Sequence, residues 1–72
     1  MSDRAFGRAL RRCRNTRELS QEELAFRAGL HRTYVSQLER GIKSPSLKTI
    51  TRLARALGTV ASALVRKSER SA

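Results

Sequence analysis

Residues 32–40, Arg-Thr-Tyr-Val-Ser-Gln-Leu-Glu-Arg, combine polar and apolar side chains at the spacing of a helix. Val35 and Leu38 recur at an interval that turns both toward a core. The opposite face then carries Arg32, Thr33, Ser36, Gln37 and Arg40. Arginine pairs with guanine, glutamine pairs with adenine, and threonine contacts the methyl group of thymine. These side chains therefore offer recognition of base edges and phosphates in duplex DNA, and the alternative is a solvated polar surface.

The segment before this stretch predicts the element that positions it. Ser20 followed three residues later by Glu23 is a capping box, so a helix begins there. Its buried stripe consists of Leu24, Ala25 and Ala28, and the small Ala25 leaves room for a crossing helix. Gly29 ends the helix at a position where a left-handed backbone is usual. Two helices joined by a short glycine turn form a helix-turn-helix unit, whose second helix enters the major groove by its N-terminal residues.

The rest of the chain predicts three further helices around one core. The first covers about residues 4–16. The fourth is capped by Ser46, carries Leu47 on its inner face and stops at Gly58; the fifth covers about residues 60–66 with Thr59 as its cap. Ile42 is expected to point inward. We therefore predict one all-α domain over residues 1–72, a compact bundle of about five short helices, ordered over about residues 4–66 with frayed ends.

Composition points to a polyanionic partner. Sixteen Lys and Arg against six Asp and Glu give a formal charge of +10, and thirteen of the sixteen are Arg.

Cys13 is the only cysteine, so no disulfide can form within the chain, which fits a reducing cytosol. No stretch has the apolar length that spans a bilayer. We therefore expect a cytoplasmic protein without a membrane role.

Several motifs together resemble the phage repressor and Cro type of helix-turn-helix regulator, often called Xre-like, which has a lambda-repressor-like DNA-binding domain. They are Leu19-Ser-Gln-Glu-Glu-Leu-Ala, Ala28-Gly-Leu, Tyr34-Val-Ser-Gln-Leu-Glu-Arg-Gly41, Pro45-Ser-Leu-Lys-Thr-Ile and Leu53-Ala-Arg-Ala-Leu-Gly58. The resemblance covers about residues 5–66. The short chain and the sequence Arg32-Thr-Tyr-Val-Ser are also similar to the controller proteins of restriction-modification systems.

The resemblance implies roles for individual residues. The base-contacting positions are Arg32, Thr33 and Gln37, with Ser36 beside them. Phosphate contacts are expected from Gln21, Tyr34, Arg40, Lys43 and Ser44. A partly buried ion pair between Arg14 and Glu39 is expected to tie the first helix to the recognition helix. His31 departs from the family pattern, because Ser, Thr or Asp usually caps the recognition helix there. The small residues Ala61 to Ala63 also depart from it, which affects how strongly the fifth helix supports a dimer.

These observations favour a transcriptional regulator that binds a pseudo-palindromic operator in double-stranded DNA as a homodimer and controls its own gene. RNA polymerase is a further candidate partner through Arg40 or its neighbours. An antitoxin-type interaction module that also binds DNA is the alternative, although only about six residues follow the fifth helix. A surface role on membranes would need a free apolar face. One histidine, one cysteine and no convergent carboxylates argue against an enzyme, a metal site or a cofactor.

Overall fold

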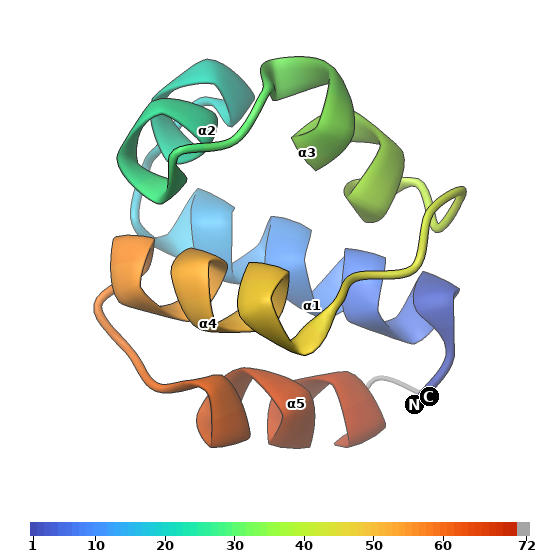
Figure 1. Ribbon diagram of the computed structural model, residues 1–72. Coiled ribbons are helices and arrows are strands. Elements are labelled where there is room, and N and C mark those ends of the chain that lie inside the picture. Colours follow the sequence, from blue (N-terminus) through green and yellow to red (C-terminus); the bar gives the residue numbers. More distant parts are fainter. Residues whose placement is uncertain (71–72) are drawn as a thin grey trace.

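The computed structural model describes residues 1–70, which fold into five α-helices. They are α1 (Asp3–Thr16), α2 (Gln21–Ala28), α3 (Arg32–Glu39), α4 (Leu47–Ala56) and α5 (Ala61–Arg70). Figure 1 shows α2 and α3 at one end of the molecule, α5 at the other end, and α1 and α4 between them. The described residues contain no strand, so the predicted all-α bundle of five short helices is confirmed.

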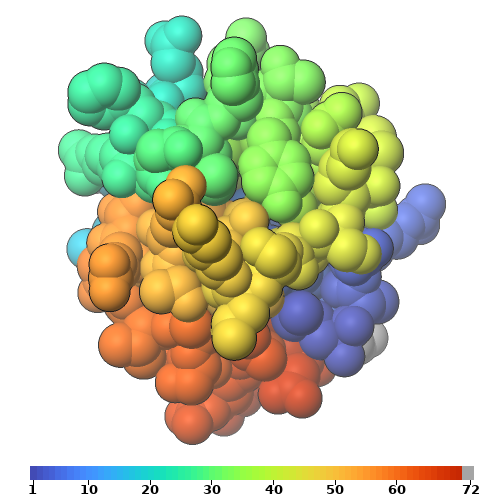
Figure 2. Space-filling model, in the orientation of Figure 1, coloured from blue at the N-terminus to red at the C-terminus, as the bar shows by residue number. Residues whose placement is uncertain are grey.

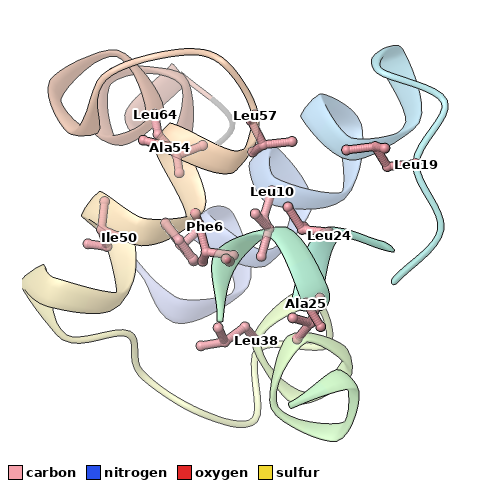
Figure 3. Packing of buried hydrophobic residues seen from close by; sticks show 13 residues of the cluster. Phe6, Leu10, Leu19, Leu24, Ala25, Leu38, Ile50, Ala54, Leu57 and Leu64 are labelled. Atoms are coloured by element: carbon pink, nitrogen blue, oxygen red, sulfur yellow. The ribbon is translucent and has the colours of Figure 1, made fainter. Parts of the chain in front are cut away.

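One apolar core joins all five helices. Phe6 and Leu10 of α1, Leu24 of α2, Leu38 of α3, Leu53 of α4 and Leu64 of α5 are all fully buried. Figure 3 shows side chains from every helix converging on the same space. Burying several large aliphatic side chains, each contributing roughly 1.5–3 kcal/mol, is the main stabilisation available to so short a chain.

Local capping signals fix where the central helices begin and end. Ser20 Oγ accepts from the backbone N–H of Glu23, and the Glu23 carboxylate accepts from the N–H of Ser20. The hydrogen bond from the Ser20 backbone is the main cause of a lowered pKa of Glu23. Gly29 has φ of 68° and closes α2, and Ser46 caps α4 by accepting from the N–H of Thr49. The predicted capping box, glycine turn and α4 cap are therefore confirmed.

The helices at both ends extend beyond the predicted ordered range. α1 begins at Asp3, because Ser2 Oγ accepts from the N–H of Ala5 and caps the helix. α5 continues to Arg70, because Ser68 is buried and its hydroxyl donates to the carbonyl of Leu64. The predicted frayed ends were wrong over residues 3 and 67–70, while residues 71–72 lie outside the described part. α5 starts at Ala61, so Val60 occupies the position before it, where Thr59 was expected.

Ile42 and Leu47 were expected to face inward and are exposed instead, and Val60, expected as the start of the fifth helix, is exposed as well. Ile42 is 59% exposed, Leu47 is 74% exposed and Val60 is 64% exposed. Ile42 follows the turn at Gly41, so helical spacing no longer determines its direction. Leu47 is the first residue of α4 and Val60 precedes α5, and the core cluster reaches neither position. The helical period was thus extended beyond the helix at Ile42 and Val60, and to a terminal residue that does not reach the core at Leu47.

Candidate nucleic-acid interface

Helix α3 is held by its apolar side and presents its polar side outward. Val35 and Leu38 are fully buried against α2 and α1, as their spacing predicts. Arg32 and Thr33 are exposed in the first turn, while Ser36 and Gln37 are half-buried along the same face. The structure thus brings the four predicted base-contacting residues onto one face, with the most accessible pair at the N-terminal end.

The start of α2 lies beside the start of α3. A shallow hollow on the surface is lined by Gln21, Arg32, Thr33 and Ser36. Gln21 is the first residue of α2, where backbone N–H groups have no carbonyl partner within the helix and favour an anion. Gln21 and three hydrogen-bonding side chains of α3 therefore surround one hollow. Figure 2 shows the same end of the molecule as one surface formed by α2 and α3.

A buried ion pair fixes the relation between α1 and α3. Arg14 Nε donates to Glu39 Oε2 at 2.6 Å, and Arg14 Nη2 donates to Glu39 Oε1 at 3.0 Å. The side chains are only 11% and 2% exposed. The hydrogen bond to Glu39 is the main cause of a raised pKa of Arg14. This is the ion pair that the sequence indicated.

The ion pair extends to α2 through two more hydrogen bonds. Gln21 Nε2 donates to Glu39 Oε1 at 3.1 Å, and Arg14 Nη1 donates to the carbonyl of Leu19 at 2.8 Å. One amide hydrogen of Gln21 is therefore engaged, and the N–H of Glu23 is used by the Ser20 cap. The donors at this end of α2 that a phosphate could use are the second amide hydrogen of Gln21 and the N–H groups of Gln21 and Glu22. Glu39 thus links α3, which carries the predicted base contacts, to Gln21, which is expected to contact a DNA phosphate.

Of the other predicted phosphate contacts, Tyr34 lies in the first turn of α3, and Arg40, Lys43 and Ser44 follow the end of the helix. Arg40 and Lys43 are exposed, and Arg40 Nε lies 3.4 Å from the carbonyl of Ser36. Tyr34 packs against the core, with its hydroxyl 3.4 Å from Thr49 Oγ1. Ser44 Oγ donates to Asp3 Oδ2, so its hydroxyl is used to attach the α3–α4 loop to α1. The phosphate contacts of these residues stay predictions.

Gly7 is a structural determinant of this interface that sequence reasoning missed. A Cβ atom at this buried position would lie 2.4 Å from the carbonyl oxygen of Leu38 and 2.6 Å from that of Glu39. Only glycine lets the end of α3 approach α1 this closely. A glycine inside an otherwise regular helical pattern was the available signal, because such a residue costs stability unless packing requires it.

The start of α3 lacks a side-chain cap, as the departure at His31 suggested. His31 occupies the N-cap position and makes no capping hydrogen bond. The first N–H groups of α3 are therefore free of a side-chain acceptor at the same end as Arg32 and Thr33. This leaves polar donors of both backbone and side chain at the accessible end of the helix.

Helix α3 crosses α2 after a glycine turn and exposes a polar face, and the chain has a formal charge of +10. These features define a DNA-binding regulator of transcription. The helix-turn-helix family model matches residues 10–63. The chain therefore belongs to the helix-turn-helix family, and the resemblance to repressor and Cro-type regulators is confirmed.

Named relatives come from control proteins and phage repressors. The chain is 46% identical over 54 residues to the control protein C.BamHI of Bacillus amyloliquefaciens, covering 74% of this chain and 67% of the relative. It is 41% identical over 59 residues to the immunity repressor protein of Bacillus phage phi105, covering 82% of this chain but 41% of the relative. The match to the phage repressor is therefore to less than half of that protein.

A solved structure shares both the fold and the sequence. The restriction-modification controller protein C.AhdI from Aeromonas hydrophila superposes with a TM-score of 0.84 at 45% identity. The match covers 86% of this chain and 94% of that protein.

Among residues 1–70, no helix has the length and apolar character needed to cross a membrane, and no cluster of three potential metal ligands occurs.

Proposed function

We propose that this chain binds a specific operator in double-stranded DNA as a homodimer and thereby controls transcription of its own gene. The observation that carries the proposal is the shared hollow of Gln21, Arg32, Thr33 and Ser36, which supports a phosphate contact from α2 next to base contacts from α3. Helix α3 would enter the major groove by its first turn. Similarity to control proteins and a phage repressor supports a role in gene control.

The roles of the individual residues follow from this docking. Arg32, Thr33, Ser36 and Gln37 would contact base edges, and Gln21, Arg40 and Lys43 would contact phosphates on either side. Tyr34 and Ser44 would reach the backbone only if their hydroxyls also serve the DNA, because both already have partners. The chain would act through binding alone, without catalysis, and contact with RNA polymerase would depend on where the operator lies.

Homodimer formation follows from the size of the interface. One α3 presents only four candidate base-contacting side chains, and pairing two chains on a pseudo-palindrome doubles that number. Specific regulators typically bind their sites at ~10⁻⁸–10⁻¹¹ M, and a single module buries less surface on DNA than a dimer does. Two half-sites would then lie about one helical turn apart, ~34–36 Å.

Fluorescence anisotropy tests the proposal directly. The labelled DNA would be the segment upstream of the chain's own gene, with scrambled DNA of equal length as the control, at two salt concentrations. Preference for the upstream DNA by ~10³ or more at physiological salt is expected. Equal binding that weakens in parallel as salt rises would reduce the interaction to general phosphate attraction at this site. A selection from random duplexes would then show whether any specific operator exists.

A further inference from the structure

A second basic hollow lies between α1, the α4–α5 turn and α5. Its walls carry four cationic side chains, and no acidic side chain of residues 1–70 lines it; the four are Arg12, Arg17, Lys67 and Arg70. Cys13 of α1 is a half-buried apolar residue of its lining, Ala9 and Leu57 line it but are almost fully buried, and Thr59 is at the turn. The cavity volume is about 480 Å³, within the ~300–1,000 Å³ typical of small-molecule sites.

This hollow is separate from the proposed DNA interface. Figures 1 and 2 show α2 and α3 at one end of the molecule and α5 at the opposite end. None of its lining residues also lines the hollow beside α3. DNA held on α3 would therefore leave this second hollow facing away from the same duplex.

Arg17 and Arg70 are the side chains most available for a ligand. The guanidinium of Arg17 lies over the α4–α5 turn, because a Cβ atom placed on Gly58 would be 3.1 Å from Arg17 Nη2. Both arginines are exposed, and neither forms an ion pair within residues 1–70. Arg12 and Lys67 also interact elsewhere in the molecule, and Lys67 Nζ lies 3.8 Å from Cys13 Sγ. Arg17 and Arg70 are therefore the two cationic side chains of this hollow on which we base the choice of ligand.

The charge pattern indicates the kind of ligand. Like charges gathered around a concave surface repel one another, and the same geometry concentrates the field that attracts an anion. Guanidinium groups match the oxygens of a phosphate with paired hydrogen bonds. The half-buried Cys13 in the lining favours a molecule that also has an uncharged part. We propose that this hollow binds a small phosphorylated molecule, with its phosphates on Arg17 and Arg70 and its uncharged part beside Cys13.

Isothermal titration calorimetry with magnesium-free ATP tests this site, with tripolyphosphate and adenosine as partial ligands. The variant Arg17→Gln/Arg70→Gln removes two charges from the hollow. Arg27→Gln/Arg52→Gln removes two exposed charges from α2 and α4, so it matches the change in net charge. ATP affinity is expected to fall about tenfold or more in the first variant and less than about twofold in the second. ATP should bind more tightly than either partial ligand.

Several results would overturn the assignment. Undetectable ATP binding, or equal weakening in both double variants, would leave only general charge attraction. Displacement of ATP by a saturating duplex would place the nucleotide on the DNA interface instead. If Arg17→Gln/Arg70→Gln altered sedimentation equilibrium but not ATP affinity, a second copy of the chain would be the occupant. All four substituted arginines are exposed, so each variant is expected to fold. Thermal unfolding followed by circular dichroism checks this.

Discussion

Arginine side chains in this chain differ in what surrounds them. Arg14 is nearly buried and is held by Glu39 and the carbonyl of Leu19. Arg32 is exposed at the start of α3, beside a hollow that also contains Gln21. The guanidinium group of Arg14 therefore stabilises the fold, whereas that of Arg32 is a candidate base contact. Substitutions at the two positions should consequently change different measurable properties.

Removing one partner of the buried ion pair should destabilise the fold. Glu39→Ala leaves the Arg14 guanidinium unpaired and also removes the acceptor of Gln21, so we expect a loss of about 3–5 kcal/mol in unfolding free energy. The double variant Arg14→Met/Glu39→Met removes both charges and should lose distinctly less. Urea unfolding monitored by circular dichroism measures both values. A single variant no less stable than the double one would show that the unpaired charge carries little cost.

Base-contacting and phosphate-contacting residues should give distinct binding signatures. Arg32→Ala should cost about 1–3 kcal/mol at the correct operator and relax sequence preference, because a base contact is lost. Lys43→Ala should weaken binding to all duplexes alike and reduce the slope of affinity against salt by about one. Anisotropy titrations on matched and mismatched operators at several salt concentrations separate the two. If Arg32→Ala lowered affinity for every sequence equally, Arg32 would be a phosphate contact.

At the scale of elements, the crossing of α1 and α3 depends on one missing side chain. In an unhindered helix, replacing glycine by alanine gains roughly 0.5–1 kcal/mol. Gly7→Ala should instead lose about 1–3 kcal/mol, because its Cβ would overlap the carbonyl oxygens of Leu38 and Glu39. The end of α3 must then shift, so operator affinity should fall even where the variant is fully folded.

Gly58→Ala provides the matched control for that change. Gly58 has φ of +73°, so alanine there is strained by about 1–2 kcal/mol, but the site lies in the α4–α5 turn away from α3. Its stability should fall by a similar amount while operator affinity is kept. Thermal unfolding and anisotropy on the same preparations give both readouts. A Gly7→Ala protein as stable as the parent would contradict the close approach of the two helices.

The capping box at the start of α2 predicts a pH dependence. The pKa of Glu23 is lowered in the folded state, mainly by the hydrogen bond from the Ser20 backbone. Its carboxylate therefore adds stability above the ordinary glutamate pKa of about 4.3, and this part is lost as pH falls through the lowered value. The parent should unfold at a higher temperature than Glu23→Gln at pH 7, with the difference shrinking as the pH falls below the ordinary glutamate pKa. A difference that stayed constant would mean that ionisation of Glu23 adds nothing.

Features encoded by neighbouring residues were predictable from the sequence, and those that depend on packing were not. Ser20 and Glu23 lie within one helical turn, and Gly29 acts through its own backbone angle, so residue types and spacing sufficed. The close approach at Gly7 and the hydrogen bond from Ser44 to Asp3 join segments far apart in the chain. The polar end of α5 was predicted to fray, and this was wrong because Ser68 is buried. That burial depends on tertiary neighbours and could not be read from the local sequence. The face of α3 was predicted, and its contacts with DNA stay predictions.

At the scale of the whole molecule, charge alone would attract the chain to any duplex. A formal charge of +10 provides a sequence-independent attraction that weakens steeply with salt. Under the proposed function, specific recognition comes from the small face of α3, and dimer formation would strengthen it by doubling that face. Because the molecule measures only 27 × 23 × 22 Å, two touching copies can place their recognition helices only a limited distance apart.

This size predicts how binding responds to the spacing of half-sites. In the preferred operator the half-site centres should lie ~34–36 Å apart, within reach of two touching copies. Inserting five base pairs turns one half-site by about half a helical turn, to the wrong side of the duplex. Inserting about ten restores the face but moves the centres to ~68–70 Å, more than twice the 27 Å length of the molecule. Both insertions should therefore reduce affinity to that of a single half-site. Anisotropy on the three duplexes and on one half-site measures this, and equal affinity for all four would show that the chain binds each half-site as an independent monomer.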